Sequence, residues 1–204
     1  GIYKSMNLSY TRGDDKGAVD ENFRRFCDRL HMDWQKIVCT DQTHTANVRI
    51  VTEADEGHGI SRPKSFFDVD GQVTDVPGLP LITYHADCVP LFFVDPVKKA
   101  IGLTHSGWRG TAARIGRNTV ETMQKAYGSR PEDIIAVIGP SGCQNCSEVS
   151  EDVARAFMEG FRISDRLVYA KGGGKYQLNL WEANRQIMVD AGIKPEHITV
   201  TAWC

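Results

Sequence analysis

The chain has 204 residues, of which 41% are hydrophobic and 25% are charged, so it can bury a full hydrophobic core and we expect one domain spanning residues 1–204. Its formal net charge of −2 gives no basic field that would attract nucleic acid or an anionic membrane. No apolar run approaches transmembrane length and Gly1 opens no signal peptide, so we expect a cytoplasmic protein. We expect the six cysteines to be reduced thiols.

The spacing of apolar residues predicts helices and strands along the chain. The predicted helices cover 18–30, 112–127, 149–161 and 177–191, and the predicted strands cover 36–40, 46–52, 81–84, 88–95, 101–105, 134–138 and 198–203. Residues 53–70, which include His58, are typical of an exposed excursion, and 70–80 are rich in turn residues. Several strands follow one another without helices between them, which predicts the α+β class.

Two of these strands each carry a metal-capable residue at one end. Cys88 stands where the first strand begins and His105 where the next one stops, so a turn at 95–96 would bring both to the same edge of a sheet. His44 follows another short apolar run. These spacings are far too wide for a zinc finger, and a site drawn from separate strand ends is more often catalytic than structural. Two imidazoles and one thiolate on Zn²⁺ would leave a fourth position for water, with the pKa of that water lowered to roughly 7.

Other polar residues surround this group in the sequence. His85 precedes Cys88 by three positions, and strand alternation would turn it to the opposite face, so we interpret it as a pocket residue. Asp87 would hold a loop or orient a histidine. Arg109 lies beside a predicted helix N-terminus, where it would either help to bind phosphate or pair with a carboxylate.

Two further motifs are weaker. Cys143 and Cys146 form a single C-x-x-C pair, for which a chance pairing, a disulfide and a second metal all stay open. Residues 171–175 lack the spacing of a phosphate-binding loop and predict a flexible loop.

Three motifs carry a family resemblance. Residues 42–44, 85–90 and 105–110 resemble the Q-x-H, A-D-C-x-P and H-x-G-W-R-G signatures of the YfiH family, also called the laccase-domain or polyphenol oxidase family. Weaker matches extend over almost the whole chain. The resemblance implies layered mixed β-sheets covered by helices, like the catalytic domain of cytotoxic necrotizing factor. The sequence departs from the family pattern at Cys143, Ser147 and Asn179.

The resemblance also implies a function. His44, Cys88 and His105 are expected to bind one transition metal, usually zinc with copper as the alternative, beside a pocket for purine nucleosides. The implied reactions are phosphorolysis of adenosine, inosine and methylthioadenosine with inorganic phosphate, and deamination of adenosine. The catalytic residues would be the three ligands and Arg109. Asn7, in a matching Ser-x-Asn-Leu segment, would bind substrate together with His85 and Arg109.

Three other interpretations stay open. A His₂Cys set also suits a blue-copper centre, but a laccase needs a trinuclear copper cluster as well, and six histidines in the whole chain do not suffice. Cys88 and His105 could instead act without metal as the nucleophile and base of a hydrolase. A purely structural ion would need Cys146 or His85 as a fourth ligand.

Overall fold

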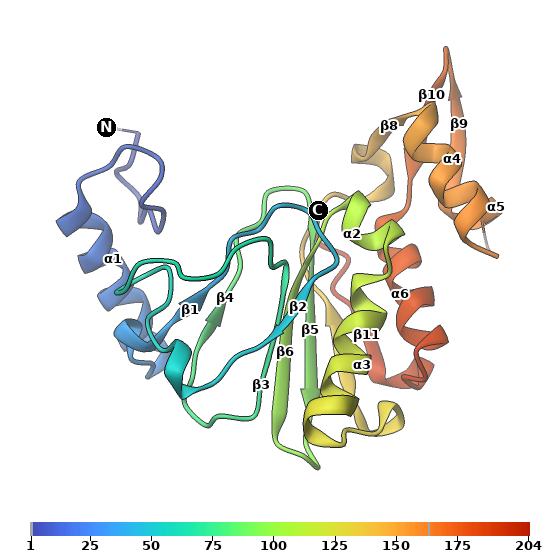
Figure 1. The fold of residues 1–204 in the computed structure, drawn as a ribbon. Coiled ribbons are helices and arrows are strands. Elements are labelled where there is room, and N and C mark those ends of the chain that lie inside the picture. Colours follow the sequence, from blue (N-terminus) through green and yellow to red (C-terminus); the bar gives the residue numbers. More distant parts are fainter. Residues whose placement is uncertain (1, 163) are drawn as a thin grey trace.

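A computed structural model describes residues 2–162 and 164–204, and its centre is a six-stranded mixed sheet (Figure 1). The strands lie in the order β11 (Ile198–Val200), β7 (Ile135–Ile138), β5 (Val89–Asp95), β6 (Ala100–Ser106), β3 (Gly71–Thr74) and β2 (Val48–Ile50). The pairs β5–β6, β3–β6 and β5–β7 are antiparallel, whereas β11–β7 and β2–β3 are parallel. The hairpin of β5 and β6 therefore occupies the middle of the sheet.

Helices cover one face of this sheet. The helices here are α2 (Trp108–Ala112), α3 (Ile115–Tyr127) and α6 (Leu180–Asp190), and Figure 1 shows α3 and α6 side by side. α3 contacts β6, β3 and β2, and α6 contacts β7 and β11. Alternate residues of β5, among them Leu91 and Phe93, are fully buried in the same cluster as Val120 and Met188. This cluster is the main hydrophobic core.

The N-terminal helix α1 (Lys16–Leu30) lies on the other side of the sheet (Figure 1). Asp15 caps it by accepting a hydrogen bond from the Ala18 N–H at 2.9 Å. Its buried stripe of Val19, Phe23 and Cys27 packs on a small cluster that includes Ile37. The short parallel strands β1 (Val38–Cys39) and β4 (Leu81–Ile82) lie next to this cluster.

A second, antiparallel sheet projects from the other end of the molecule (Figure 1). Its strands are β8 (Glu148–Ser150), β10 (Lys175–Leu178) and β9 (Val168–Gly172), accompanied by α4 (Glu151–Gly160) and α5 (Ser164–Leu167). Short 3₁₀ helices span Trp34–Lys36, Glu53–Asp55, Pro131–Asp133, Gln144–Cys146 and Pro195–His197. Among the described residues, no helix is both long and apolar enough to span a bilayer.

The predicted α+β class with layered mixed sheets is confirmed, and several element boundaries are corrected. The helix predicted over 112–127 is interrupted at Arg114, whose φ of 63° is left-handed, so α2 and α3 are separate. The helices predicted over 149–161 and 177–191 each begin with strand residues, those of β8 and β10. Residues 171–175 form the turn and ends of the β9–β10 hairpin rather than a flexible loop.

The prediction that His58 is a solvated loop residue is wrong. Its side chain is buried and stacks on Phe66 with ring centroids 3.6 Å apart. Its Nδ1 lies 3.0 Å from the Cys39 carbonyl oxygen, and its Nε2 accepts the Ser65 N–H at 2.7 Å. Burial lowers the pKa of His58. His58 therefore links residues 53–70 to Cys39, in the segment that follows α1, and part of 53–70 is folded around its ring.

Candidate metal centre and active site

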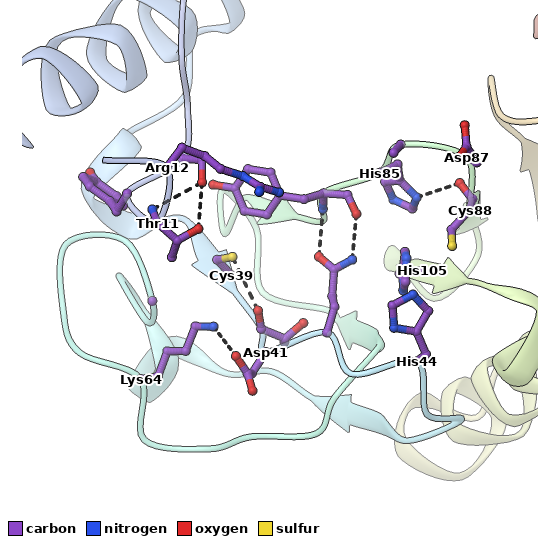
Figure 2. Close-up of a pocket in the computed structure, with 17 residues that line it drawn as sticks. Thr11, Arg12, Cys39, Asp41, His44, Lys64, His85, Asp87, Cys88 and His105 are labelled. Atoms are coloured by element: carbon purple, nitrogen blue, oxygen red, sulfur yellow. Dashed lines mark hydrogen bonds and ion pairs between the residues drawn. The ribbon is translucent and has the colours of Figure 1, made fainter. Parts of the chain in front are cut away.

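The structure brings His44, Cys88 and His105 together. One donor atom from each side chain lies within 4.8 Å of the other two, and Figure 2 shows the three at one end of a pocket. Cys88 comes directly before β5 and His105 lies in β6, where Pro90 pairs with His105. The turn predicted at 95–96 thus places the sulfur and one imidazole at the same edge of the sheet. His44 arrives from the loop after β1.

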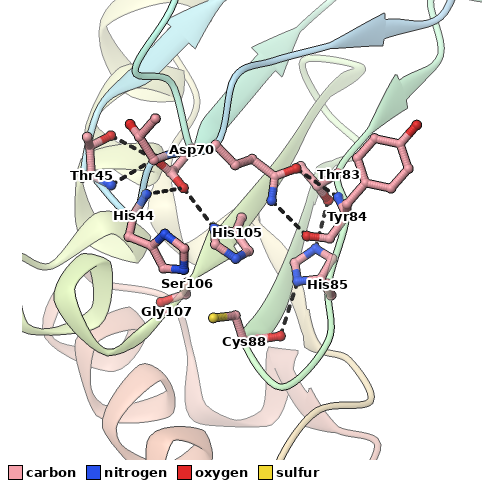
Figure 3. A network of polar contacts seen from close by, with 12 residues as sticks. His44, Thr45, Asp70, Thr83, Tyr84, His85, Cys88, His105, Ser106 and Gly107 are labelled. Carbon is pink, nitrogen blue, oxygen red and sulfur yellow. Dashed lines mark hydrogen bonds and ion pairs between the residues drawn. The ribbon is translucent and has the colours of Figure 1, made fainter. Parts of the chain in front are cut away.

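A buried carboxylate, Asp70, holds both histidines (Figure 3). Its Oδ1 lies 2.7 Å from Nδ1 of His105 and accepts the backbone N–H of His44 at 3.1 Å. Its Oδ2 accepts the N–H groups of Thr43 at 3.2 Å and Thr45 at 2.8 Å. Since Asp70 engages Nδ1 of His105, Nε2 is the ring nitrogen left for an ion. The same bonds hold His44 at its left-handed φ of 65°.

The pKa shifts follow from these contacts. Burial opposes ionisation of Asp70, but the hydrogen bonds from His105 and Thr45 outweigh it and lower the pKa of Asp70. Burial likewise lowers the pKa of His105, and the hydrogen bonds to Asp70 and Cys88 overcome this and raise it to about 9. In the metal-free protein His105 is therefore an imidazolium paired with Asp70, and a bound cation would replace its Nε2 proton.

His85 lies beside the three donors, but both of its ring nitrogens already have hydrogen-bond partners. Its Nδ1 is 3.1 Å from the Cys88 carbonyl oxygen and its Nε2 is 2.8 Å from Thr83 Oγ1. The residues from Thr83 to Cys88 are not in a strand, so the alternation argument does not apply. Burial lowers the pKa of His85 to about 4, so its ring is neutral near pH 7. His85 lines the pocket and is not one of the three converging donors.

Gly107 provides the space in which the three donors meet. A Cβ added there would lie 2.9 Å from Cδ2 of His44 and 3.0 Å from Sγ of Cys88. Its φ of −72° is ordinary, so the glycine is required by space and not by backbone conformation. Two imidazoles and a thiolate around a gap kept free of side-chain atoms fit a tetrahedral ion such as zinc.

A buried polar network fixes the backbone around Gly107. Ser106 Oγ lies 2.8 Å from Thr111 Oγ1 and 2.9 Å from Asn184 Oδ1. Thr111 Oγ1 also donates to the Gly107 carbonyl oxygen at 2.9 Å. All four residues are buried, so the end of β6 is tied to α2 and α6 and cannot shift freely.

A cavity of about 640 Å³ adjoins the three donors (Figure 2). It is lined by residues 9–12, 39–42, 84–88, His44, Gly59, Lys64 and His105. His44, Cys88 and His105 lie at one end, and Arg12 and Lys64 lie toward the other (Figure 2). Lys64 is paired with Asp41. Tyr10 and Tyr84 supply aromatic surface to the lining.

Two side-chain amides shape the cavity wall. Gln42 donates from Nε2 to the Tyr84 carbonyl oxygen at 2.7 Å and accepts the Tyr84 N–H on Oε1 at 2.8 Å. This reciprocal pair ties the His44 loop to the segment that leads to Cys88. Asn7 is not among the lining residues; its side chain bonds both backbone groups of Ser9 and therefore supports the 9–12 wall from behind.

Arg109 stands in the first turn of α2, as predicted, but it is exposed and does not line the cavity. Its guanidinium carbon lies 4.2 Å from the centroid of the Trp108 ring. The structure therefore does not bring Arg109 together with the three donors. Asp87 lines the cavity, while the role of orienting a histidine, which the sequence suggested for it, belongs to Asp70.

Comparisons with known proteins agree with the motifs. The family model described as multi-copper polyphenol oxidoreductase laccase matches residues 1–204. The purine nucleoside phosphorylase YlmD of Bacillus subtilis is 37% identical over 203 residues, covering 99% of this chain and 73% of the relative. The adenosine deaminase RL5 of an unknown prokaryotic organism is 33% identical over 204 residues, covering 99% and 78%.

Solved structures share the fold. The crystal structure of YlmD from Geobacillus stearothermophilus superposes with a TM-score of 0.93 at 35% identity, covering 100% of this chain and 76% of that one. The crystal structure of Bacillus licheniformis YfiH gives a TM-score of 0.92, also at 35% identity, covering 98% and 75%. The three motifs, the family match over residues 1–204 and these structures together show that the chain belongs to the YfiH, or laccase-domain, family.

Proposed function

We propose that the protein is a zinc-dependent purine nucleoside phosphorylase that cleaves adenosine, inosine and methylthioadenosine with inorganic phosphate, and that it also deaminates adenosine. The observation that carries the proposal is the convergence of His44, Cys88 and His105 beside an open cavity of about 640 Å³. This volume lies within the range of small-molecule sites, roughly 300–1,000 Å³. Relatives named for both activities support the reaction classes.

The three donors would hold the ion, with Asp70 fixing the tautomer of His105 and the position of His44. When bound, zinc would supply a Lewis acid that polarises a substrate oxygen or activates water. His85 would not act as a further ligand, because both of its ring nitrogens are engaged elsewhere, so a bound ion would keep a position for substrate or water. The site is thus suited to reaction and not only to structural binding.

The remaining lining residues would bind the nucleoside. Tyr10, Tyr84 and the neutral ring of His85 offer apolar surface for a purine base. We place phosphate near Arg12, because Arg12 is among the residues that line the cavity and Arg109 is not.

A product assay tests this proposal. The zinc-loaded protein is incubated with adenosine in the presence and absence of phosphate. Adenine with ribose 1-phosphate reports phosphorolysis, and inosine reports deamination. His105→Ala should lose the zinc held with His44 and Cys88 and should form neither product, while its circular dichroism stays native. If the loaded protein yields neither product from adenosine, inosine or methylthioadenosine, the proposal is wrong.

The same assay separates the competing interpretations. A metal-free hydrolase would keep its activity after chelation and lose it on alkylation of Cys88. A polyphenol oxidase of the multicopper type needs further clustered histidines, and within residues 2–162 and 164–204 the second group of potential ligands contains only cysteines. Copper-loaded protein should therefore oxidise phenols no faster than its His105→Ala variant.

A further inference from the structure

A second group of three thiols lies outside the site described above. Cys143, Cys146 and Cys204 each place the sulfur within 4.8 Å of the other two. Cys143 is partly exposed and the other two are exposed, and all three are free thiols. Nothing in the proposed reaction uses them.

The local backbone explains why Cys143 and Cys146 face each other. Gln144–Cys146 form a 3₁₀ helix, and the Cys146 N–H donates to the Cys143 carbonyl oxygen at 3.0 Å. A 3₁₀ helix has three residues per turn, so side chains three apart eclipse one another. The C-x-x-C spacing on this turn therefore places both sulfurs on the same side.

Long-range pairing brings Cys204 to this turn. Beyond the parallel ladder of β7 and β11, the Thr201 N–H donates to Ile138 and the Ser141 N–H donates to Trp203, both at 3.0 Å. Ala202, at a left-handed φ of 56°, redirects the chain between these two bonds. The Cys143 N–H then donates to Sγ of Cys204 at 3.3 Å. Main-chain hydrogen bonds thus fix the position of the third sulfur.

We propose that Cys143, Cys146 and Cys204 form a second metal site, which binds a thiophilic ion of the Zn²⁺ type through three thiolates. A C-x₂-C pair joined by a distant cysteine is a ligand arrangement that such ions favour, and an N–H donated to sulfur stabilises the thiolate form. Three sulfurs this close cannot all ionise without repelling one another, and a bound cation would remove that repulsion. A disulfide would engage two of them and leave the third unpaired.

An ion at the three thiols would also strengthen the surroundings of the first metal site. Besides the link to Cys204, the Gly142 N–H donates to the Asp87 carbonyl oxygen at 3.1 Å, next to Cys88 in the sequence. An ion at the three thiols would therefore tie the Gln144 turn and the segment after β11 to the loop before β5. Its expected role is structural.

Metal stoichiometry of the reduced full chain tests the proposal. Metal-depleted protein is titrated with Zn²⁺ in the presence of a phosphine reductant. Bound metal is then measured by elemental mass spectrometry. The unchanged chain should bind two equivalents, and Cys204→Ser should bind one fewer. Cys88→Ser, which removes a donor of the first site, should retain the equivalent at the three thiols. Gln144→Ala, inside the C-x-x-C turn, is the matched control and should bind as the unchanged chain does.

Cobalt gives a second measurement that does not depend on stoichiometry. Co²⁺-loaded Cys88→Ser should show sulfur-to-cobalt charge-transfer absorption, which adding Cys204→Ser should abolish. Unchanged zinc content in Cys204→Ser, or absence of charge-transfer absorption in folded Cys88→Ser, would overturn the proposal. So would a disulfide among the three cysteines that persists with Zn²⁺ and reductant. If the first site fails to bind, the counts of the unchanged chain, Gln144→Ala and Cys204→Ser each fall by one, that of Cys88→Ser stays the same, and the difference caused by Cys204→Ser remains.

Discussion

Nδ1 of His105 lies 2.7 Å from Oδ1 of Asp70, and both side chains are buried. The same carboxylate accepts three consecutive backbone N–H groups of the loop that carries His44. One side chain therefore sets the orientation of two potential ligands that are 61 residues apart in the sequence.

Asp70→Asn should disturb the first site more than any other change that leaves all three donors in place. An amide cannot accept every bond that the carboxylate accepts, and it removes the charge that raises the pKa of His105. We expect zinc affinity to fall about 10- to 100-fold. In the metal-free protein, the pKa of His105 measured by NMR should fall from about 9 toward roughly 6.5.

Asp68→Asn is the matched control, because Asp68 is exposed and bonds only the Thr43 hydroxyl of this loop through its carboxylate. Its zinc affinity should stay close to that of the unchanged chain. Equal losses in the two variants would show that the loop, and not the Asp70–His105 contact, determines binding.

Gly107→Ala should weaken metal binding while the fold persists. The added methyl group would press on His44 and Cys88, and the surrounding Ser106–Thr111 network resists a backbone shift. Zinc titration should show a loss of affinity, while the circular dichroism stays native. Gly160→Ala is the control, since a Cβ there meets nothing within 4 Å. Unchanged zinc binding in Gly107→Ala would mean that the donors move apart easily.

His58 should make the stability of the metal-free protein depend on pH. Its pKa is lowered by burial, so the unfolded chain binds the proton more readily than the folded chain. The free energy of unfolding should therefore fall as pH drops below roughly 6.5, the ordinary value for histidine, and continue to fall until the lowered pKa is reached. Urea unfolding at several pH values measures this slope.

His58→Gln should be less stable at pH 7 but show a smaller loss between neutral and acid pH. His31→Asn is the control, because His31 is exposed at the end of α1 and asparagine tolerates its left-handed φ of 55°. That control should keep the full pH dependence. An undiminished slope in His58→Gln would assign the dependence to other groups.

Arg12→Ala should raise the KM for phosphate with a smaller effect on the KM for the nucleoside. Arg12 is a cavity-lining residue, and truncation removes a charge-assisted hydrogen-bond donor for an anion. Arg109→Ala should change the phosphate KM less, because Arg109 stacks on Trp108 outside the lining. Steady-state kinetics with phosphate varied at saturating inosine distinguishes the two. The reverse ranking would return the phosphate site to the N-terminus of α2.

The sequence was sufficient to predict that Cys88 and His105 meet, because a short turn joins the strands that carry them. Asp70 could not be found in the same way. It lies just before β3, whose residues include buried Gln72 and Thr74 and so lack the apolar alternation of a strand. Its contact with His105 depends on the pairing of β3 with β6, which is not a local property of the chain.

The sheet of β8, β9 and β10 escaped prediction for a related reason. β9 has one buried residue, Val168, followed by four exposed ones, and three glycines with positive φ form or flank its turn. Such a hairpin has the composition of a loop. The C-x-x-C pair was ambiguous because the third cysteine, Cys204, reaches it only through the pairing of β7 with β11.

The central hairpin has a kinetic consequence. Cys88 and His105 are 17 residues apart and need only β5 and β6 to become neighbours, whereas His44 must wait until β3 has docked and Asp70 is in place. Closing the short loop costs less chain entropy than joining the distant segment. During refolding, Cys88 and His105 should therefore become neighbours before His44 joins them. Zinc bound at that stage would have only two protein ligands and a lower affinity than in the folded protein.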